Sequence, residues 1–98
     1  MVEIRRTKAY NDFFGALRDS KAKALIALRI DRLAQGHVGD AAPIGEGVSE
    51  LRLHYGPGYR VYYIQRGAVL IVLLCGGDKS SQQRDIKRAK QMAQNLEI

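Results

Sequence analysis

The sequence is poor in the residues that build metal sites and disulfides. Its 98 residues include one cysteine, Cys75, and two histidines, His37 and His54, which lie far apart in the chain. A single cysteine cannot form an internal disulfide, and at the end of an apolar run it is expected to be a small buried hydrophobe. No spacing typical of metal ligands occurs, and no Cys–His or Ser–His–Asp arrangement can be assembled. The sequence therefore predicts no bound metal, no cofactor and no nucleophilic side chain.

Long apolar runs are also absent. The longest, 68–75, is too short to span a bilayer, and the N-terminus lacks the basic-then-apolar order of a signal peptide. We therefore expect a soluble, cytoplasmic protein that makes no contact with membranes. A chain of this length, without repeats or a linker-like change in composition, is expected to form one domain over residues 1–98.

The sequence has fewer acidic than basic residues. Sixteen Lys and Arg against ten Asp and Glu give a net charge of +6, and the pI is near 9.8. On so small a domain this charge produces a positive field over much of the surface, which favours polyanionic partners such as nucleic acids. The same charge is also compatible with a role in solubility alone, so the positions of the basic residues must decide.

Hydrophobic periodicity predicts an α+β fold in the order strand, helix, helix, three strands, helix, with the three consecutive strands forming an antiparallel meander. The glycine-rich segment 36–47 shows little periodicity and is expected to be a mobile surface loop. Ser80–Gln83 resembles a helix capping box. The predicted elements are a strand at 2–6, helices at 8–18 and 21–35, strands at 48–55, 58–66 and 68–75, and a helix from about 80 to the end of the chain.

Two of the predicted strands carry basic residues on one face. Alternation puts Glu50, Arg52 and His54 opposite to the apolar side, and on the next strand Arg60 and Tyr62 share that face. A short turn would bring Arg60 across from Arg52 and make a cationic patch on an open sheet face. Directly opposed like charges cost up to about 1 kcal/mol unless an anion, or a carboxylate such as Glu50, lies between them. The alternative is a solvated face on which arginine stems cover apolar surface.

A second cationic feature follows the last strand. The run Gly76–Ser81 leads into the N-terminus of the last helix, where unpaired N–H groups favour anions, and Lys79 adds a positive charge there. The spacing of a P-loop is absent, so no nucleoside triphosphate site is predicted. The alternative is that this run only caps the helix.

These basic residues fit one reaction, the cleavage of an RNA phosphodiester by its own 2′-hydroxyl. That reaction needs a proton acceptor, a proton donor and cations that stabilise the phosphorane. Arginine cannot act as a base at neutral pH, so we assign Arg52 and Arg60 to phosphate binding and transition-state stabilisation. His54 or Lys79 is left for proton transfer.

Several runs of the sequence resemble a known toxin family. Residues 50–63 (ELRLHYGPGYRVYY), 73–82 (LLCGGDKSSQ) and 85–86 are similar to the addiction module killer proteins, a branch of the RelE/ParE toxins related to the HigB toxins. The resemblance spans most of the chain and implies a RelE-like fold, with two N-terminal helices against a small curved sheet. It also implies the toxin of a type II toxin–antitoxin system, which cuts messenger RNA on the ribosome without a metal until an antitoxin protein covers it.

The resemblance also bears on single residues. Arg60 matches the family's strand arginine, Arg52 falls near its basic strand position, and Lys79 is a looser match to the basic residue after the last strand. RelE itself uses a tyrosine in the C-terminal helix, whereas this chain has Asp85 in that region and no tyrosine. The proton-transfer residue is therefore open, and His54 is the candidate that fills the gap.

Two other functions fit a basic domain of this fold. ParE-like proteins inhibit DNA gyrase by binding it and hydrolyse nothing, but a gyrase binder would not need cations that converge at one point of a sheet. A plain nucleic-acid-binding module would spread its basic residues along a groove with aromatic side chains for stacking, and Tyr62 is the one good stacking candidate on the basic face. We therefore favour the nuclease.

The C-terminal helix carries a set of basic residues that we expect to grip the phosphates of ribosomal RNA. The antitoxin is expected to contact either this helix or the cationic sheet face. The alternative is that the helix cations form only a solvated face. These residues are Arg84, Lys87, Arg88 and Lys90.

Overall fold

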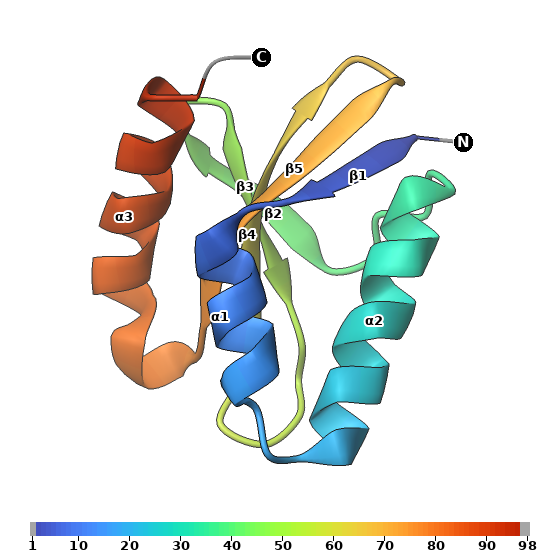
Figure 1. Cartoon of the computed structure of the whole chain (residues 1–98), viewed down its shortest axis with the longest axis vertical. Helices are drawn as coiled ribbons and strands as arrows, with labels where there is room; N and C mark the ends of the chain where they lie inside the picture. The colour runs from blue at the N-terminus through green and yellow to red at the C-terminus, as the bar shows by residue number, and fades with distance from the viewer. Residues whose placement is uncertain (1, 97–98) are drawn as a thin grey trace.

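The computed structural model describes residues 2–96, which form an α+β fold with a five-stranded mixed sheet and three helices (Figure 1). The order of elements agrees with the prediction except for one additional strand, β2. No helix within these residues is both long and apolar enough to cross a membrane. The elements are β1 (Glu3–Arg6), α1 (Lys8–Ala16), α2 (Ser20–Ala34), β2 (Ala41–Gly45), β3 (Val48–Arg52), β4 (Arg60–Arg66), β5 (Leu70–Gly77), a 3-10 turn (Lys79–Ser81) and α3 (Gln82–Gln94).

The sheet has the strand order β1-β5-β4-β3-β2. Strands β2 to β5 form an antiparallel meander, as predicted for its last three members, and β1 pairs in parallel with β5. Helices α1 and α2 pack on one face of the sheet and α3 packs on the other. Two layers of helix therefore enclose the sheet.

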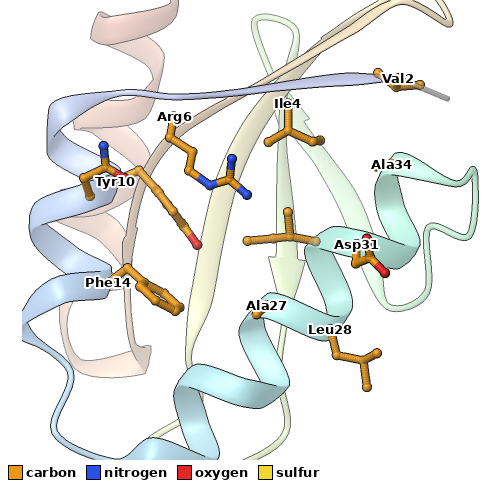
Figure 2. Close-up of a pocket in the computed structure, with 11 residues that line it drawn as sticks. Val2, Ile4, Arg6, Tyr10, Phe14, Ala27, Leu28, Asp31 and Ala34 are labelled. Atoms are coloured by element: carbon orange, nitrogen blue, oxygen red, sulfur yellow. The ribbon is translucent and has the colours of Figure 1, made fainter.

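A pocket of about 720 Å³ lies between β1, α1 and α2. Figure 2 shows Arg6 and Tyr10 projecting into the space between the two helices. Apolar side chains such as Phe14 and Leu28 form much of its wall. None of the basic residues singled out from the sequence lines this pocket, so the predicted chemistry lies elsewhere.

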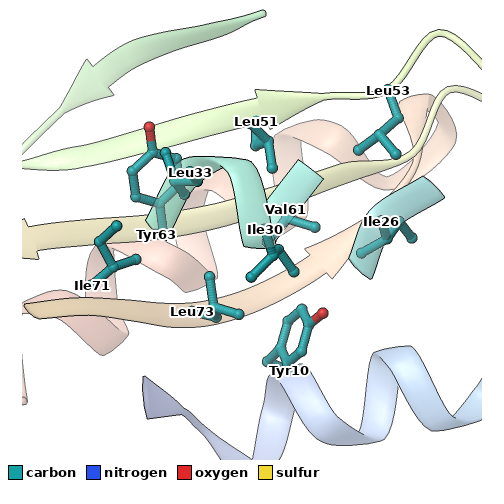
Figure 3. Packing of buried hydrophobic residues seen from close by; sticks show 10 residues of the cluster. All are labelled: Tyr10, Ile26, Ile30, Leu33, Leu51, Leu53, Val61, Tyr63, Ile71 and Leu73. Atoms are coloured by element: carbon teal, nitrogen blue, oxygen red, sulfur yellow. The ribbon is translucent and has the colours of Figure 1, made fainter. Parts of the chain in front are cut away.

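The larger hydrophobic cluster lies between the sheet and the helices α1 and α2 (Figure 3). Period-two alternation accounts for its sheet half, because every second residue of β3 and β4 points to the same side. The predicted apolar positions of the meander are confirmed as core except for Tyr55, at the end of the predicted strand 48–55, which lies in the β3–β4 loop and donates a hydrogen bond to Asp19. The buried members are Tyr10, Ile26, Ile30, Leu33, Leu51, Leu53, Val61, Tyr63, Ile71 and Leu73.

A second cluster lies under α3 on the opposite face, and it contains Tyr62, Ile64, Leu74 and Cys75. The register shift between β4 and β5 beside Tyr62 lets the neighbours Leu74 and Cys75 both join this cluster. The expectation of a buried thiol is confirmed, and burial raises the pKa of Cys75 to about 11. The expectation of an open sheet face is wrong, because α3 covers most of it.

The prediction of a loop throughout 36–47 is also wrong, because β2 occupies part of that segment. Glu46 and Gly47 have positive φ angles and close a tight turn that pairs β2 with β3. Pro43 is tolerated because β2 is an edge strand. Its outer side has no partner strand, so the N–H that proline lacks is not needed there for a hydrogen bond. So short a strand, interrupted by a register shift after Pro43, shows no periodicity.

The start of the last helix differs from the predicted capping box at Ser80–Gln83. The observed capping box is made by Asp78 and Ser81. The side chain of each residue accepts a hydrogen bond from the backbone N–H of the other. A 3-10 turn therefore comes first, and α3 begins at Gln82 and ends at Gln94. The last two residues of the predicted helix lie outside the described residues.

Candidate functional site

Four strand ends meet at one end of the sheet and bring the predicted site residues together. Arg52 at the end of β3 is the direct partner of Arg60 at the start of β4, and Arg60 is the partner of Gly77 at the end of β5. Asp40 immediately precedes β2 in the same region. We call this region the basic sheet end, and it comprises Asp40, Glu50, Arg52, His54, Arg60 and Lys79.

Arg60 and Glu50 lie beneath the surface of the basic sheet end. The sequence placed both on an outward face, but Arg60 is 5% exposed and Glu50 is 2% exposed. The physical reason is the docking of α3, whose first residue Gln82 donates a hydrogen bond of 2.9 Å to Glu50 Oε2. Of the predicted phosphate-binding residues on the sheet, only Arg52 keeps a partly exposed side chain.

Glu50 lies between the side chains of the two opposed arginines and offsets the repulsion between their like charges. Its Oε1 lies 3.1 Å from Arg52 Nε, and its Oε2 lies 3.9 Å from Arg60 Nε. The Tyr62 hydroxyl donates a further hydrogen bond of 3.1 Å to Glu50. Burial raises the pKa of Glu50, but the hydrogen bonds and the arginine charges outweigh burial and leave this pKa below its ordinary value. Glu50 is therefore an ionised carboxylate that neutralises part of the cationic charge.

Tyr62 cannot serve as the stacking platform considered from the sequence. Its side chain is fully buried under α3, and its hydroxyl is bonded to Glu50. Burial first, and then the charge of Glu50, raise the pKa of Tyr62 well above its ordinary value. This tyrosine is a neutral part of the second hydrophobic cluster.

The Arg60 guanidinium has an unmet hydrogen-bonding capacity. Its Nη1 donates a hydrogen bond of 3.4 Å to the Tyr59 carbonyl, whereas its buried Nε has no acceptor within the described residues. A buried donor without an acceptor costs about 1–3 kcal/mol, and such groups are rare in folded proteins. Arg60 therefore retains a positive charge that Glu50 only partly offsets.

His54 is an exposed member of the basic sheet end, with 71% of its side chain accessible. Its Nε2 is hydrogen-bonded to Asp40 Oδ2, and the other carboxylate oxygen, Oδ1, lies 3.4 Å from Arg52 Nη1. The hydrogen bond with His54 is the main reason why the pKa of the Asp40 carboxyl lies below its ordinary value, and the Arg52 charge adds to this effect. A histidine, a carboxylate and an arginine thus form one connected surface group.

Asp40 was missed by reasoning from the sequence. It lies in the segment taken for a loop, and apart from the glycine before it nothing local distinguishes it from other exposed acids. The Arg52 N–H donates to the Asp40 carbonyl at 2.9 Å, and Arg29 on α2 donates to the carbonyls of both residues. The preceding Gly39 has a φ of 66°, and a Cβ there would lie 3.0 Å from the Arg29 guanidinium. The glycine is the one local signal for this close approach.

Lys79 lies at the other side of the basic sheet end. Its side chain packs on Gly58 in the β3–β4 loop, where an added Cβ would lie 2.9 Å from Lys79 Cγ. Gly58 has a φ of 80°, so glycine meets both the steric and the backbone requirement. The Lys79 N–H also donates to the Pro57 carbonyl at 3.4 Å. The lysine is exposed and is held beside the strand that begins with Arg60.

Asp85 occupies the region where the resembling family carries a tyrosine. Its side chain is buried and accepts a hydrogen bond of 2.5 Å from the Ser81 hydroxyl. A Cβ on Gly77 would lie 1.8 Å from Asp85 Oδ2, so the carboxylate packs directly on the strand partner of Arg60. Within residues 2–96 no cluster of three His, Cys, Asp or Glu side chains is suitable for holding a metal ion.

The four basic residues of α3 do not form one patch. Arg84 and Arg88 line a shallow pocket against α1, and Lys87 is exposed. Lys90 points toward the β2–β3 turn, where its Nζ lies 4.0 Å from a carboxylate oxygen of Glu46. The structure thus brings Arg84 and Arg88 together and separates Lys90 from them.

Comparison with known proteins finds two similarities. Residues 12–96 match the family described as "Phage derived protein Gp49-like (DUF891)". An uncharacterized protein of Haemophilus influenzae is 45% identical over 95 residues, which cover 97% of this chain and 96% of that protein. The family match includes every residue of the basic sheet end.

Proposed function

The chain belongs to the family of phage-derived Gp49-like proteins, which is associated with the toxins of toxin–antitoxin systems, and from this premise we propose that it is a ribosome-dependent endoribonuclease. It would cut messenger RNA during translation in the cytoplasm and arrest growth until a cognate antitoxin covers it. We further assign it a RelE-like fold in one domain over residues 1–98. Two helices on one sheet face and an antiparallel meander support this assignment.

One observation carries the proposal: cationic groups converge on a single sheet end beside a histidine. Arg52 and Arg60 are direct cross-strand partners, and the single carboxylate of Glu50 between them offsets only part of their combined positive charge. Lys79 and His54 border the same region from the two adjacent loops. A phosphodiester is an anion that this set of residues suits in charge and in hydrogen-bond donors.

The reaction follows from the chemistry of these side chains. His54 accepts the proton of the RNA 2′-hydroxyl, whose oxygen attacks the adjacent phosphorus while the bond from phosphorus to the 5′ oxygen breaks. Arg52 and Lys79 bind the phosphate oxygens, and Arg60 adds positive potential from beneath the surface. The leaving 5′ oxygen takes a proton from Lys79 or from the protonated His54. The products are a 2′,3′-cyclic phosphate and a 5′-hydroxyl, and this route needs no metal.

Substitution of Arg52 by alanine tests the proposed function. Induced expression of the wild-type chain should arrest growth and produce new messenger RNA 5′ ends inside translated frames, and both effects should be lost in Arg52→Ala. The control is Arg66→Ala, which removes an exposed arginine from the far end of β4 and should behave as wild type. Arrest without cuts but with DNA-damage signalling would instead indicate a gyrase inhibitor, and absence of arrest would refute the toxin.

Alanine substitution of the exposed α3 cations should weaken ribosome binding and its dependence on salt. Each lost phosphate contact lowers the slope of log K against log salt by about 0.7–0.9, so Arg84→Ala, Lys87→Ala and Arg88→Ala together should lower it by about 2–3. Lys90→Ala should have a smaller effect, because Glu46 already neutralises this lysine. Unchanged ribosome binding by the triple variant would show that these residues form only a solvated face of the helix.

A further inference from the structure

The pair formed by Asp40 and His54 has a consequence for the direction of proton transfer. Resting on the proposed function, we propose that Asp40 is the positioning residue that fixes the tautomer and the orientation of the His54 imidazole for RNA cleavage. Asp40 does not touch the substrate in this scheme. It acts through His54, whose Nε2 it binds.

Hydrogen-bond chemistry decides which imidazole nitrogen is free. An ionised carboxylate only accepts hydrogen bonds, so the nitrogen bonded to Asp40 must carry a hydrogen. That nitrogen is Nε2, and the neutral imidazole then keeps its lone pair on Nδ1. Nδ1 is thus the atom that accepts the proton of the 2′-hydroxyl. Without a partner, the exposed ring of His54 would exchange between tautomers and rotamers.

The surroundings keep Asp40 ionised and in place. Its second carboxylate oxygen lies 3.4 Å from Arg52 Nη1, and Arg29 contributes a further positive charge. The Asp40 carbonyl accepts hydrogen bonds from both arginines, so the backbone at this position is held independently of the side chain. The carboxylate is therefore oriented by groups on α2 and β3 before RNA arrives. This preorganisation is what a positioning residue requires.

Asp40 could affect cleavage by positioning His54, as proposed, or only by holding Arg52 in place. A double-mutant cycle separates these two roles. Asp40→Asn preserves the shape of the side chain and the backbone contacts, but its amide can donate to Nε2 and favour the wrong tautomer. We expect this variant to cut messenger RNA on programmed ribosomes about 10–100-fold more slowly than wild type. In a His54→Ala background, Asp40→Asn should cause no further loss. Asp31→Asn, which removes a carboxylate from α2, is the matched control.

A second readout does not depend on activity. Nitrogen NMR of the neutral imidazoles should show His54 as the Nε2–H tautomer in wild type and a share of the Nδ1–H tautomer in Asp40→Asn, with His37 unchanged as the internal reference. Rate losses that multiply in the double variant, or an unchanged tautomer, would overturn the role of Asp40 while leaving the nuclease intact. A wild-type chain that does not cut on translating ribosomes would overturn both proposals.

Discussion

Replacing His54 by alanine is expected to slow messenger RNA cleavage on programmed ribosomes by about 10²–10⁴-fold, the usual contribution of a general acid–base group. The stability of the protein should hardly change. His54 is 71% exposed, and its one side-chain hydrogen bond within the described residues is to Asp40, which keeps its contact with Arg52. Single-turnover rates at saturating toxin, together with urea unfolding, measure both quantities.

His37→Ala is the matched control for this experiment. His37 is the second histidine of the chain, is exposed, and lies in the turn after α2. Its loss should leave both the rate and the free energy of unfolding unchanged. A His54→Ala variant that cuts at the wild-type rate would remove His54 from the reaction and transfer proton uptake to Lys79.

The second large effect concerns Glu50 and stability. Glu50→Ala should lower the free energy of unfolding by about 3–5 kcal/mol, because it leaves the charge of Arg60 buried without its carboxylate partner. The side chain also accepts hydrogen bonds from Tyr62 and Gln82, which would lose their acceptor. Urea unfolding at neutral pH is the measurement. The magnitude exceeds that of a surface ion pair, since Glu50 is 2% exposed.

Glu3→Ala supplies the comparison, because Glu3 forms an exposed ion pair with Arg5 on β1. It should cost at most about 1 kcal/mol. An equal, small loss in Glu50→Ala would contradict the view that the buried carboxylate links α3 to the arginines. Replacing Glu50 and Arg60 together by methionine should recover part of the loss, because no buried charge is then left alone.

The pH dependence of the free energy of unfolding provides an independent check on the contribution of Glu50 to stability. Its pKa in the folded protein is lower than in the unfolded chain, so its contribution is complete above the unfolded value of about 4.3. The contribution disappears as the pH falls through the folded pKa. Glu50→Gln should therefore lose less stability than wild type between neutral pH and about pH 3. Asp40, whose folded pKa is also lowered, contributes with the same sign and is common to both proteins.

Short-range patterns were sufficient to predict which residues of the sheet share a face. Alternation along two neighbouring strands predicted that Arg52 and Arg60 face each other, and the register of β3 and β4 confirms it. Side chains alternate between the faces of any strand, so this inference needs no knowledge of the rest of the fold. The same local rules predicted the two N-terminal helices and the burial of Cys75.

The exposure of those faces could not be predicted in the same way. The sequence indicates that a C-terminal helix follows β5, but not on which side of the sheet it packs. Docking of α3 buries Arg60 and Glu50 and removes Tyr62 from the surface. Burial depends on elements that are distant in the chain, and no periodicity within a strand carries that information.

Asp40, at the site itself, is a further residue whose position depends on contacts between distant segments and not on local pattern. Its segment has no apolar alternation, because β2 is short and lies at the edge of the sheet. Only the pairing of β2 with β3, and the reach of Arg29 from α2, bring its carboxylate to His54. Local sequence thus determines the kinds of side chain available and the strand faces they occupy, since these depend on neighbouring residues. Which of them meet, and which remain exposed to solvent, depends on contacts between distant segments that form only in the folded chain.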